Sequence, residues 1–210
     1  MTTQLKIYNG ALRILGEPRL ASLSEDRAPR YILDEVWNDD FTRGCLEKGQ
    51  WRFATKTVQM DADTSIEPDF GHEQVFALPD DYVRIVGISP DPFFRDTLLD
   101  YAFERRYIYT SIDPIYFRYV SDHADYGGDI ANWPEAFSAL TYALMAEEVA
   151  VAITQREGTQ KRVADALKAA RAEARSLDAM QDPTRFAPSG TFVRARMGRQ
   201  GRLNTSGLGC

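Results

Sequence analysis

The chain of 210 residues contains only two cysteines, Cys45 and Cys210, and they lie far apart in the sequence. So few cysteines argue against a disulfide framework and fit a reducing compartment. Long apolar runs are missing as well. The N-terminus lacks the apolar stretch of a signal peptide, and no segment approaches about 18 uninterrupted apolar residues. We therefore expect a soluble protein that is made in the cytoplasm and does not enter a membrane.

Motifs of known catalytic and nucleotide-binding sites are also missing. The sequence has no Gly-x-Ser-x-Gly, no phosphate-binding Gly-x-x-x-x-Gly-Lys-Ser/Thr and no Gly-x-Gly-x-x-Gly that opens a helix. The adjacent carboxylates Glu147 and Glu148 would point about 100° apart on a helix, so they cannot act together on one substrate. We therefore predict that the protein is not an enzyme and has neither catalytic nor cofactor-binding residues.

The best candidate for a metal site is the segment SDHADYGGD, in which His123 stands among Asp122, Asp125 and Asp129. These residue types bind metals, but the second histidine, His72, lies about fifty residues earlier, and no Cys or Glu-x-x-His pattern completes a ligand set. We interpret the segment as a solvated turn rich in aspartate and predict no metal site. A small metal-dependent hydrolase that uses His123 and the neighbouring aspartates is the alternative function.

Acidic residues are absent from the C-terminus. Residues 183–210 contain five arginines and no carboxylate; because the whole chain has a net charge of −6, residues 1–182 carry −11. The segment has too few apolar residues to offset the entropy of ordering itself. We interpret it as an extended arm that docks on a neighbouring protein through apolar and basic side chains. The residues predicted to dock are Phe186, Phe192, Val193, Arg194, Arg196, Met197, Arg199 and Arg202.

Two other interpretations of the arm stay open. The arm is also compatible with a solubilising end or a cloning remnant that has no partner. Its arginines are further compatible with a nucleic-acid-binding module, because they can neutralise phosphates, although the attached body with a net charge of −11 opposes this. Steeply salt-dependent DNA binding would favour that module, whereas a docking arm also needs its apolar residues.

Helical and strand patterns segregate along the chain instead of alternating, which predicts an α+β fold. Apolar spacings of three and four predict helices over residues 3–15, from an N-cap at Asp26 to Phe41, from Pro134 to a break at Gly158 and Thr159, and over about 160–180. A period of two after Trp51 predicts an antiparallel meander. Its candidate strands are WRFATKTVQ, EQVFAL, YVRIVGI, RRYIYT and IYFRYV.

These elements predict a helical bundle of about four helices from both chain ends, with a small antiparallel β domain inserted between its halves. The bundle comprises residues 1–50 and 130–182, the β domain residues 51–129, and the extended C-terminal arm residues 183–210. Both faces of the strand IYFRYV are partly apolar. We expect helices to cover one of these faces and a partner protein to cover the other.

Four blocks of the sequence resemble, in order, the head-to-tail adaptor proteins of short-tailed bacteriophages, the tail tubular protein A family. The similarity extends over residues 7–197, and the order of the blocks is more specific than any one of them. The first block is the strongest. The blocks are YNGALRILGEPRLASLSEDRAPRYILDEVWNDDFTRGCLEKGQWRFA, EPDFGHEQVFALPDDYVRIVGIS, YGGDIANWPEAF and ARSLDAMQDPTRF.

The resemblance implies a structural virion protein: a dodecameric connector ring that attaches beneath the portal protein after DNA packaging and carries tail nozzle or fibre proteins. It implies a location in the neck of the virion, and in the host cytoplasm during assembly. DNA would pass through the ring without specific binding. The helices would pack side to side around the ring, the β domain would face tail components, and the arm, with Phe192 and residues 194–197, would dock on the portal. Acidic channel walls would repel DNA, although an acidic surface also simply keeps a protein soluble.

Overall fold

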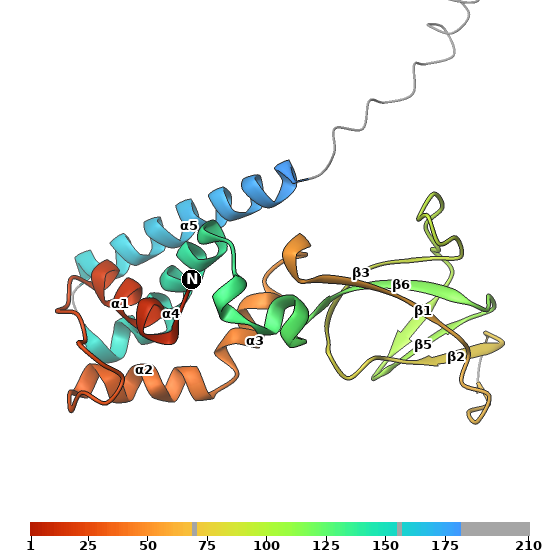
Figure 1. Ribbon diagram of the computed structural model, residues 1–210, viewed down its shortest axis with the longest axis horizontal. Coiled ribbons are helices and arrows are strands. Elements are labelled where there is room, and N and C mark those ends of the chain that lie inside the picture. The colour runs from red at the N-terminus through yellow and green to blue at the C-terminus, as the bar shows by residue number, and fades with distance from the viewer. Residues whose placement is uncertain (69–70, 155–156, 182–210) are drawn as a thin grey trace, which may run out of the picture.

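The computed structural model describes residues 1–68, 71–154 and 157–181 and has the predicted α+β fold (Figure 1). Most helices lie at one end of the molecule and the strands at the other, with a short helix, α3, between them. The α-helices are α1 Gln4–Leu15, α2 Ala28–Asn38, α3 Phe41–Glu47, α4 Glu135–Ile153 and α5 Glu157–Met180. The strands are β1 Thr55–Met60, β2 Gln74–Ala77, β3 Tyr82–Ser89, β4 Ala102–Glu104, β5 Tyr107–Thr110 and β6 Ile115–Ser121.

Helix α4 is the centre of the helical part and packs against α1, α2 and α5. Eleven of its nineteen residues are buried, which explains why α4 alone among the described helices is long and apolar enough to cross a membrane. One strip along α4 is buried over its first half only. Phe137, Leu140 and Leu144 are buried, but Glu148 and Val151 are exposed, because the neighbouring helices leave this strip of α4 open.

Helix α1 begins and ends where local side-chain chemistry favours it. Thr3 precedes the helix, and its hydroxyl accepts a hydrogen bond from the Lys6 N–H at 3.2 Å. Gly16 follows the helix with a φ of 79°, a left-handed conformation that glycine adopts without strain. The helix buries Ile7 and Leu12 in the helical core, so the helix predicted over residues 3–15 is confirmed.

The predicted second helix is divided into α2 and α3. A corner separates them at Asp40, whose φ of 52° lies outside the helical region. The predicted N-cap is also wrong. Arg27 occupies that position without a side-chain cap, and Asp26 instead accepts a hydrogen bond from the Tyr31 hydroxyl at 2.8 Å.

The strands form two antiparallel sheets within the described residues, not the predicted meander. Strand β6 lies between β1 and β3 in one sheet, and β5 lies between β2 and β4 in the other. The first and last strands of the β part therefore pair directly, with Thr55 opposite Val120. Local turn signals do not specify such a long-range pairing, since register depends on which faces become buried. The three-residue strand β4 is too short to show a period and is absent from the predicted strands.

The two faces of β6 contribute to two different cores. Ile115, Phe117 and Tyr119 are fully buried in the core of the β part, together with residues of the second sheet. Val120 points to the other face and belongs to the helical core. The prediction that a partner protein covers one face is therefore wrong, because the second sheet of the same chain covers it.

Helix α3 joins the helical and β parts through hydrogen bonds. Arg43 forms an ion pair with the Asp122 carboxylate and donates to the Tyr82 carbonyl at 2.6 Å. Arg84 of β3 donates to the Glu47 carbonyl at 2.7 Å. Because these contacts add to the shared apolar packing of the helical core, they hold the β part in a fixed orientation.

A second polar cluster lies where strands β1, β3 and β6 meet and is centred on Asp81. Its carboxylate accepts hydrogen bonds from Lys56 Nζ at 2.8 Å, from the Tyr119 hydroxyl at 2.9 Å and from the Ser121 hydroxyl at 2.7 Å. Partial burial by itself would raise the pKa of Asp81. The bonds from Lys56, Ser121 and Tyr119 together outweigh burial and lower the pKa of Asp81 to about 2.

The lowered pKa of Asp81 predicts a pH-dependent contribution to stability. Ionised Asp81 stabilises the fold above about pH 4, its ordinary titration range, and this contribution is lost as the pH falls towards 2. We expect Asp81→Asn to lower the free energy of unfolding by about 1–2 kcal/mol at pH 7, with a smaller difference from the wild type at pH 2 to 3. Urea denaturation at pH 7 and at pH 2 to 3 measures the free energy of unfolding of both proteins. The adjacent Asp80→Asn is the control, because Asp80 pairs only with exposed Arg106 and should cost less than about 0.5 kcal/mol.

Two helical glycines predict substitution effects of opposite sign. A Cβ added at Gly10 of α1 would lie 2.4 Å from the Tyr142 ring, whereas one added at Gly44 of α3 would meet nothing within 4 Å. We expect Gly10→Ala to destabilise the protein by about 1–3 kcal/mol through overpacking. Gly44→Ala should be neutral or stabilise it by up to about 1 kcal/mol. Thermal or urea unfolding tests both, and a harmless Gly10→Ala would contradict the close packing of α1 on α4.

Candidate interaction surfaces

The predicted docking arm lies outside the described residues. Helix α5 ends at Met180, and the description stops at Gln181, before the first predicted docking residue, Phe186. The role of the residues from Phe186 to Arg202 therefore stays a prediction.

The segment SDHADYGGD forms a turn in which several side chains have structural partners. Asp122 pairs with Arg43, and Asp129 accepts hydrogen bonds from the Ala131 N–H and the Asn132 amide, both at 2.9 Å. His123 Nδ1 accepts a hydrogen bond from the backbone N–H two residues later at 3.2 Å. Among the described residues, no group of three or more His, Cys, Asp or Glu side chains is placed to hold a metal ion.

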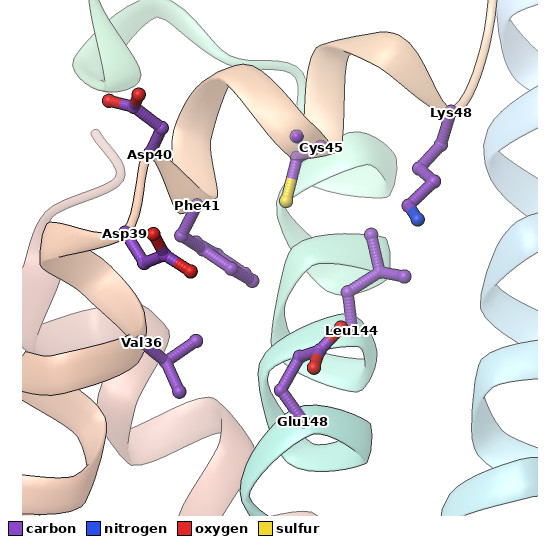
Figure 2. Close-up of a pocket in the computed structure, with 9 residues that line it drawn as sticks. Val36, Asp39, Asp40, Phe41, Cys45, Lys48, Leu144 and Glu148 are labelled. Atoms are coloured by element: carbon purple, nitrogen blue, oxygen red, sulfur yellow. The ribbon is translucent and has the colours of Figure 1, made fainter.

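A pocket of about 200 Å³ lies between helices α2, α3 and α4 (Figure 2). Apolar and charged side chains from all three helices surround it. Its lining includes three carboxylates and one ammonium group, so the pocket has a negative local charge. The apolar lining includes Val36, Phe41 and Leu144, and the charged residues are Asp39, Asp40, Glu148 and Lys48.

Cys45 lines the same pocket and is almost fully buried. Burial raises the pKa of its thiol well above the ordinary value. A thiolate is the reactive form of cysteine, and at neutral pH this thiol stays protonated. The pocket therefore combines a negative total charge with an apolar wall, and its cysteine is not an activated nucleophile.

The sequence pattern does not reveal this pocket, because it assigns residues 26–41 to one continuous helix. The corner at Asp40 turns α3 away from α2 and brings Asp39 next to Phe41 at the opening. One signal could have found it. Asn and Asp favour turns and left-handed conformations, so Asn38 followed by two aspartates is a plausible helix end.

Large apolar side chains are exposed in the connections of the β part and in its short strand β4. Phe93 is 72% exposed and Leu99 is 84% exposed, and Phe103 and Ile112 are also exposed. The Arg95 guanidinium lies 4.9 Å from the centre of the Phe93 ring. Large exposed apolar side chains are candidates for contact with another protein. The sequence analysis did not predict these exposed residues, because the segment between β3 and β4 has neither the apolar spacing of a helix nor the alternation of a strand. The Phe-Phe and Leu-Leu pairs in this segment could have indicated them.

No protein-family model matches the chain, and no curated protein is significantly similar to it in sequence. An α+β fold is compatible with many unrelated functions, so the fold alone does not select one. The features of this chain that bear on its function are its charge pattern, its exposed surfaces and the resemblance of its sequence blocks.

These contacts predict that His123 has no metal-dependent role. We expect His123→Ala to leave the metal content of the purified protein unchanged and to alter the free energy of unfolding by less than about 0.5 kcal/mol, since His123 is exposed. Asp122→Asn is the comparison, because it weakens the pair with Arg43 and should destabilise the protein more. Stoichiometric zinc that disappears in His123→Ala would instead support the hydrolase alternative.

Proposed function

We propose that the protein is a head-to-tail adaptor of a short-tailed bacteriophage. Twelve copies would form a ring beneath the portal protein, carry tail nozzle or fibre proteins and surround part of the DNA channel. The observation that carries this proposal is the segregation of charge in a chain whose blocks resemble such adaptors. Residues 1–182 have a net charge of −11, whereas residues 183–210 have five arginines and no carboxylate.

An acidic body suits a channel for DNA. Carboxylates repel phosphates directly, so DNA would pass the ring without being held by it. The same net charge of −11 opposes the nucleic-acid-binding alternative, since the five arginines of the arm would have to overcome it.

The proposal assigns one task to each part of the chain. The helical part would contact neighbouring copies in the ring. The β part, with exposed Phe93 and Leu99, would contact tail components. The arm would dock on the portal through its apolar and basic residues. Such a protein acts in the neck of the virion and is found in the host cytoplasm during assembly.

The composition of the arm also supports a sequence of assembly steps. If copies stay apart until they meet the portal, an arm that orders only on docking would start ring formation. The lateral contacts would then be too weak to close a ring in solution. This order of events would prevent empty rings from competing for tail proteins.

The alternative, a metal-dependent hydrolase, has less support. Asp122 and Asp129 are bound to Arg43 and to a helical turn, so a metal at His123 would have to compete for both carboxylates. The buried thiol of Cys45 offers no substitute nucleophile.

Deletion of the arm tests the proposed function. We expect a protein lacking residues 183–210 to fold but to bind purified portal rings at least about tenfold more weakly, because all the predicted docking residues are removed. A protein lacking only residues 203–210 is the matched control, since it keeps every one of them and should bind like the full chain. Co-sedimentation with portal rings measures binding, and urea denaturation checks folding. Equal binding by both deletion variants and the full chain would contradict the proposed docking arm.

A further inference from the structure

A second groove lies on nearly the opposite side of α4 from the acidic pocket. It has a volume of about 300 Å³ and lies between α1 and the first half of α4. Tyr142 lines this groove, whereas Leu144 lines the acidic pocket. These residues are two positions apart in the sequence, and residues i and i+2 of an α-helix lie about 160° apart around its axis. The charged residues of the groove are Lys6, Arg13, Arg19 and Glu135.

Tyr142 gives this groove an unused hydrogen-bond donor. The residue is 5% exposed, and its buried hydroxyl donates no hydrogen bond to a described residue. The Lys6 ammonium lies near the hydroxyl oxygen, and the pKa of Lys6 is raised first by Glu135 and also by Tyr142. Gly10 leaves the space that the ring occupies, because a Cβ there would lie 2.4 Å from it. A buried hydroxyl that donates no hydrogen bond is unfavourable, so an acceptor that reaches it after a small shift of the side chains around it would be stabilised.

The charges of the groove specify the chemistry of that acceptor. Lys6, Arg13 and Arg19 outnumber the one carboxylate, Glu135, with which Lys6 forms an ion pair at 2.9 Å. Arg13 and Arg19 are exposed. A carboxylate would therefore find both a hydroxyl donor and guanidinium groups, which form strong charge-assisted hydrogen bonds. The groove is suited to an acidic protein segment.

This chain itself presents such a segment on its other side. Glu35, Asp39 and Asp40 are exposed at the corner between α2 and α3, next to the acidic pocket, and Glu148 adds a fourth carboxylate. The left-handed backbone at Asp40 makes this corner protrude from the line of α2. We name residues 35–40 with Glu148 the acidic corner, and Lys6, Arg13, Arg19 and Tyr142 the basic groove.

We propose that the acidic corner of one copy binds the basic groove of a second copy of this chain. This inference rests on the proposed ring and names the surfaces that join its subunits. Because the two surfaces lie on nearly opposite sides of α4, each bound copy keeps one of them free. The contact is heterologous, and repeating it leads to a closed ring when the rotation between copies permits.

The same charges disfavour other arrangements. A two-fold contact of corner with corner, or of groove with groove, would bring like charges together across the interface. A two-fold contact that pairs corner with groove twice would need both surfaces on one side of the molecule, whereas they lie on nearly opposite sides of α4. Free DNA would have to approach a body with a net charge of −11 to reach the three cations of the groove. A second copy is the partner that offers complementary charge at both surfaces.

Cysteine cross-linking of the full chain tests the contact even where it is transient. Pro18→Cys and Asn38→Cys place thiols at exposed positions beside the groove and the corner without removing their charges. All these proteins also carry Cys210→Ser, so Cys45 is the one native cysteine that remains, and it is buried. With a short bis-maleimide, we expect a ladder of dimers, trimers and larger products from the double-cysteine protein. Each single-cysteine protein should stay monomeric, because a heterologous contact never brings two identical positions together.

Two controls separate this ladder from random collision. A protein with Thr57→Cys and Glu104→Cys carries two exposed thiols in the β part and should give no ladder above the single-cysteine background. Adding Arg13→Glu and Arg19→Glu to the double-cysteine protein should reduce the ladder about tenfold or more. Lys161→Glu and Lys168→Glu on α5 change the net charge equally and should leave the ladder intact, since they lie outside the groove.

The outcomes distinguish this inference from the proposed function. Dimers from either single-cysteine protein, or a ladder no stronger than that of the β-part control, would overturn the proposed contact. If rings of the wild type nevertheless form on portals, the adaptor function stands and a different surface joins the copies. If the double-cysteine protein forms no ladder and the wild type forms no rings on portals, both proposals are wrong.

Discussion

Helix α4 imposes the main constraint on this fold, because most of its circumference is apolar and must be covered. Eleven of its nineteen residues are buried, and the residues that cover them come from both ends of the chain, through α1 and α2 before the β part and α5 after it. The chain must therefore leave the helical part and return to it. The polar joint between Arg43 and Asp122 lies where the departing and returning segments meet.

The way in which α4 is covered also sets the surfaces that are left. Hollows remain on two sides of the helix, one lined by Leu144 and Glu148 beside the corner of α2 and α3, the other lined by Tyr142 beside α1. The first is acidic and the second is basic, although neither charge is needed to bury α4. The β part has a different character, since its exposed Phe93 and Leu99 are apolar. Several chemically distinct surfaces and a cationic C-terminal segment are the features on which the proposed connector role rests.

Local patterns in the sequence predicted the α+β class, helix α1 with its glycine stop, and most strand positions. These features depend on nearby residues: the left-handed Gly16 and the alternation of Ile115, Phe117 and Tyr119 are visible in the sequence. The corner at Asp40 and the pairing of β1 with β6 were not predicted, because packing between distant segments decides them. The acidic pocket depends on that corner, so it was missed as well. The docking arm lies outside the described residues and stays a prediction.

The central claim is that this chain works as one of many copies bound to a larger circular assembly. Negative-stain imaging of the full chain, alone and mixed with portal rings, tests it most directly. The account predicts a ring with a central channel stacked coaxially on each portal, and no such ring on portals imaged without the protein. A chain that stays monomeric in the presence of portals, and whose images show bare portals only, would contradict it.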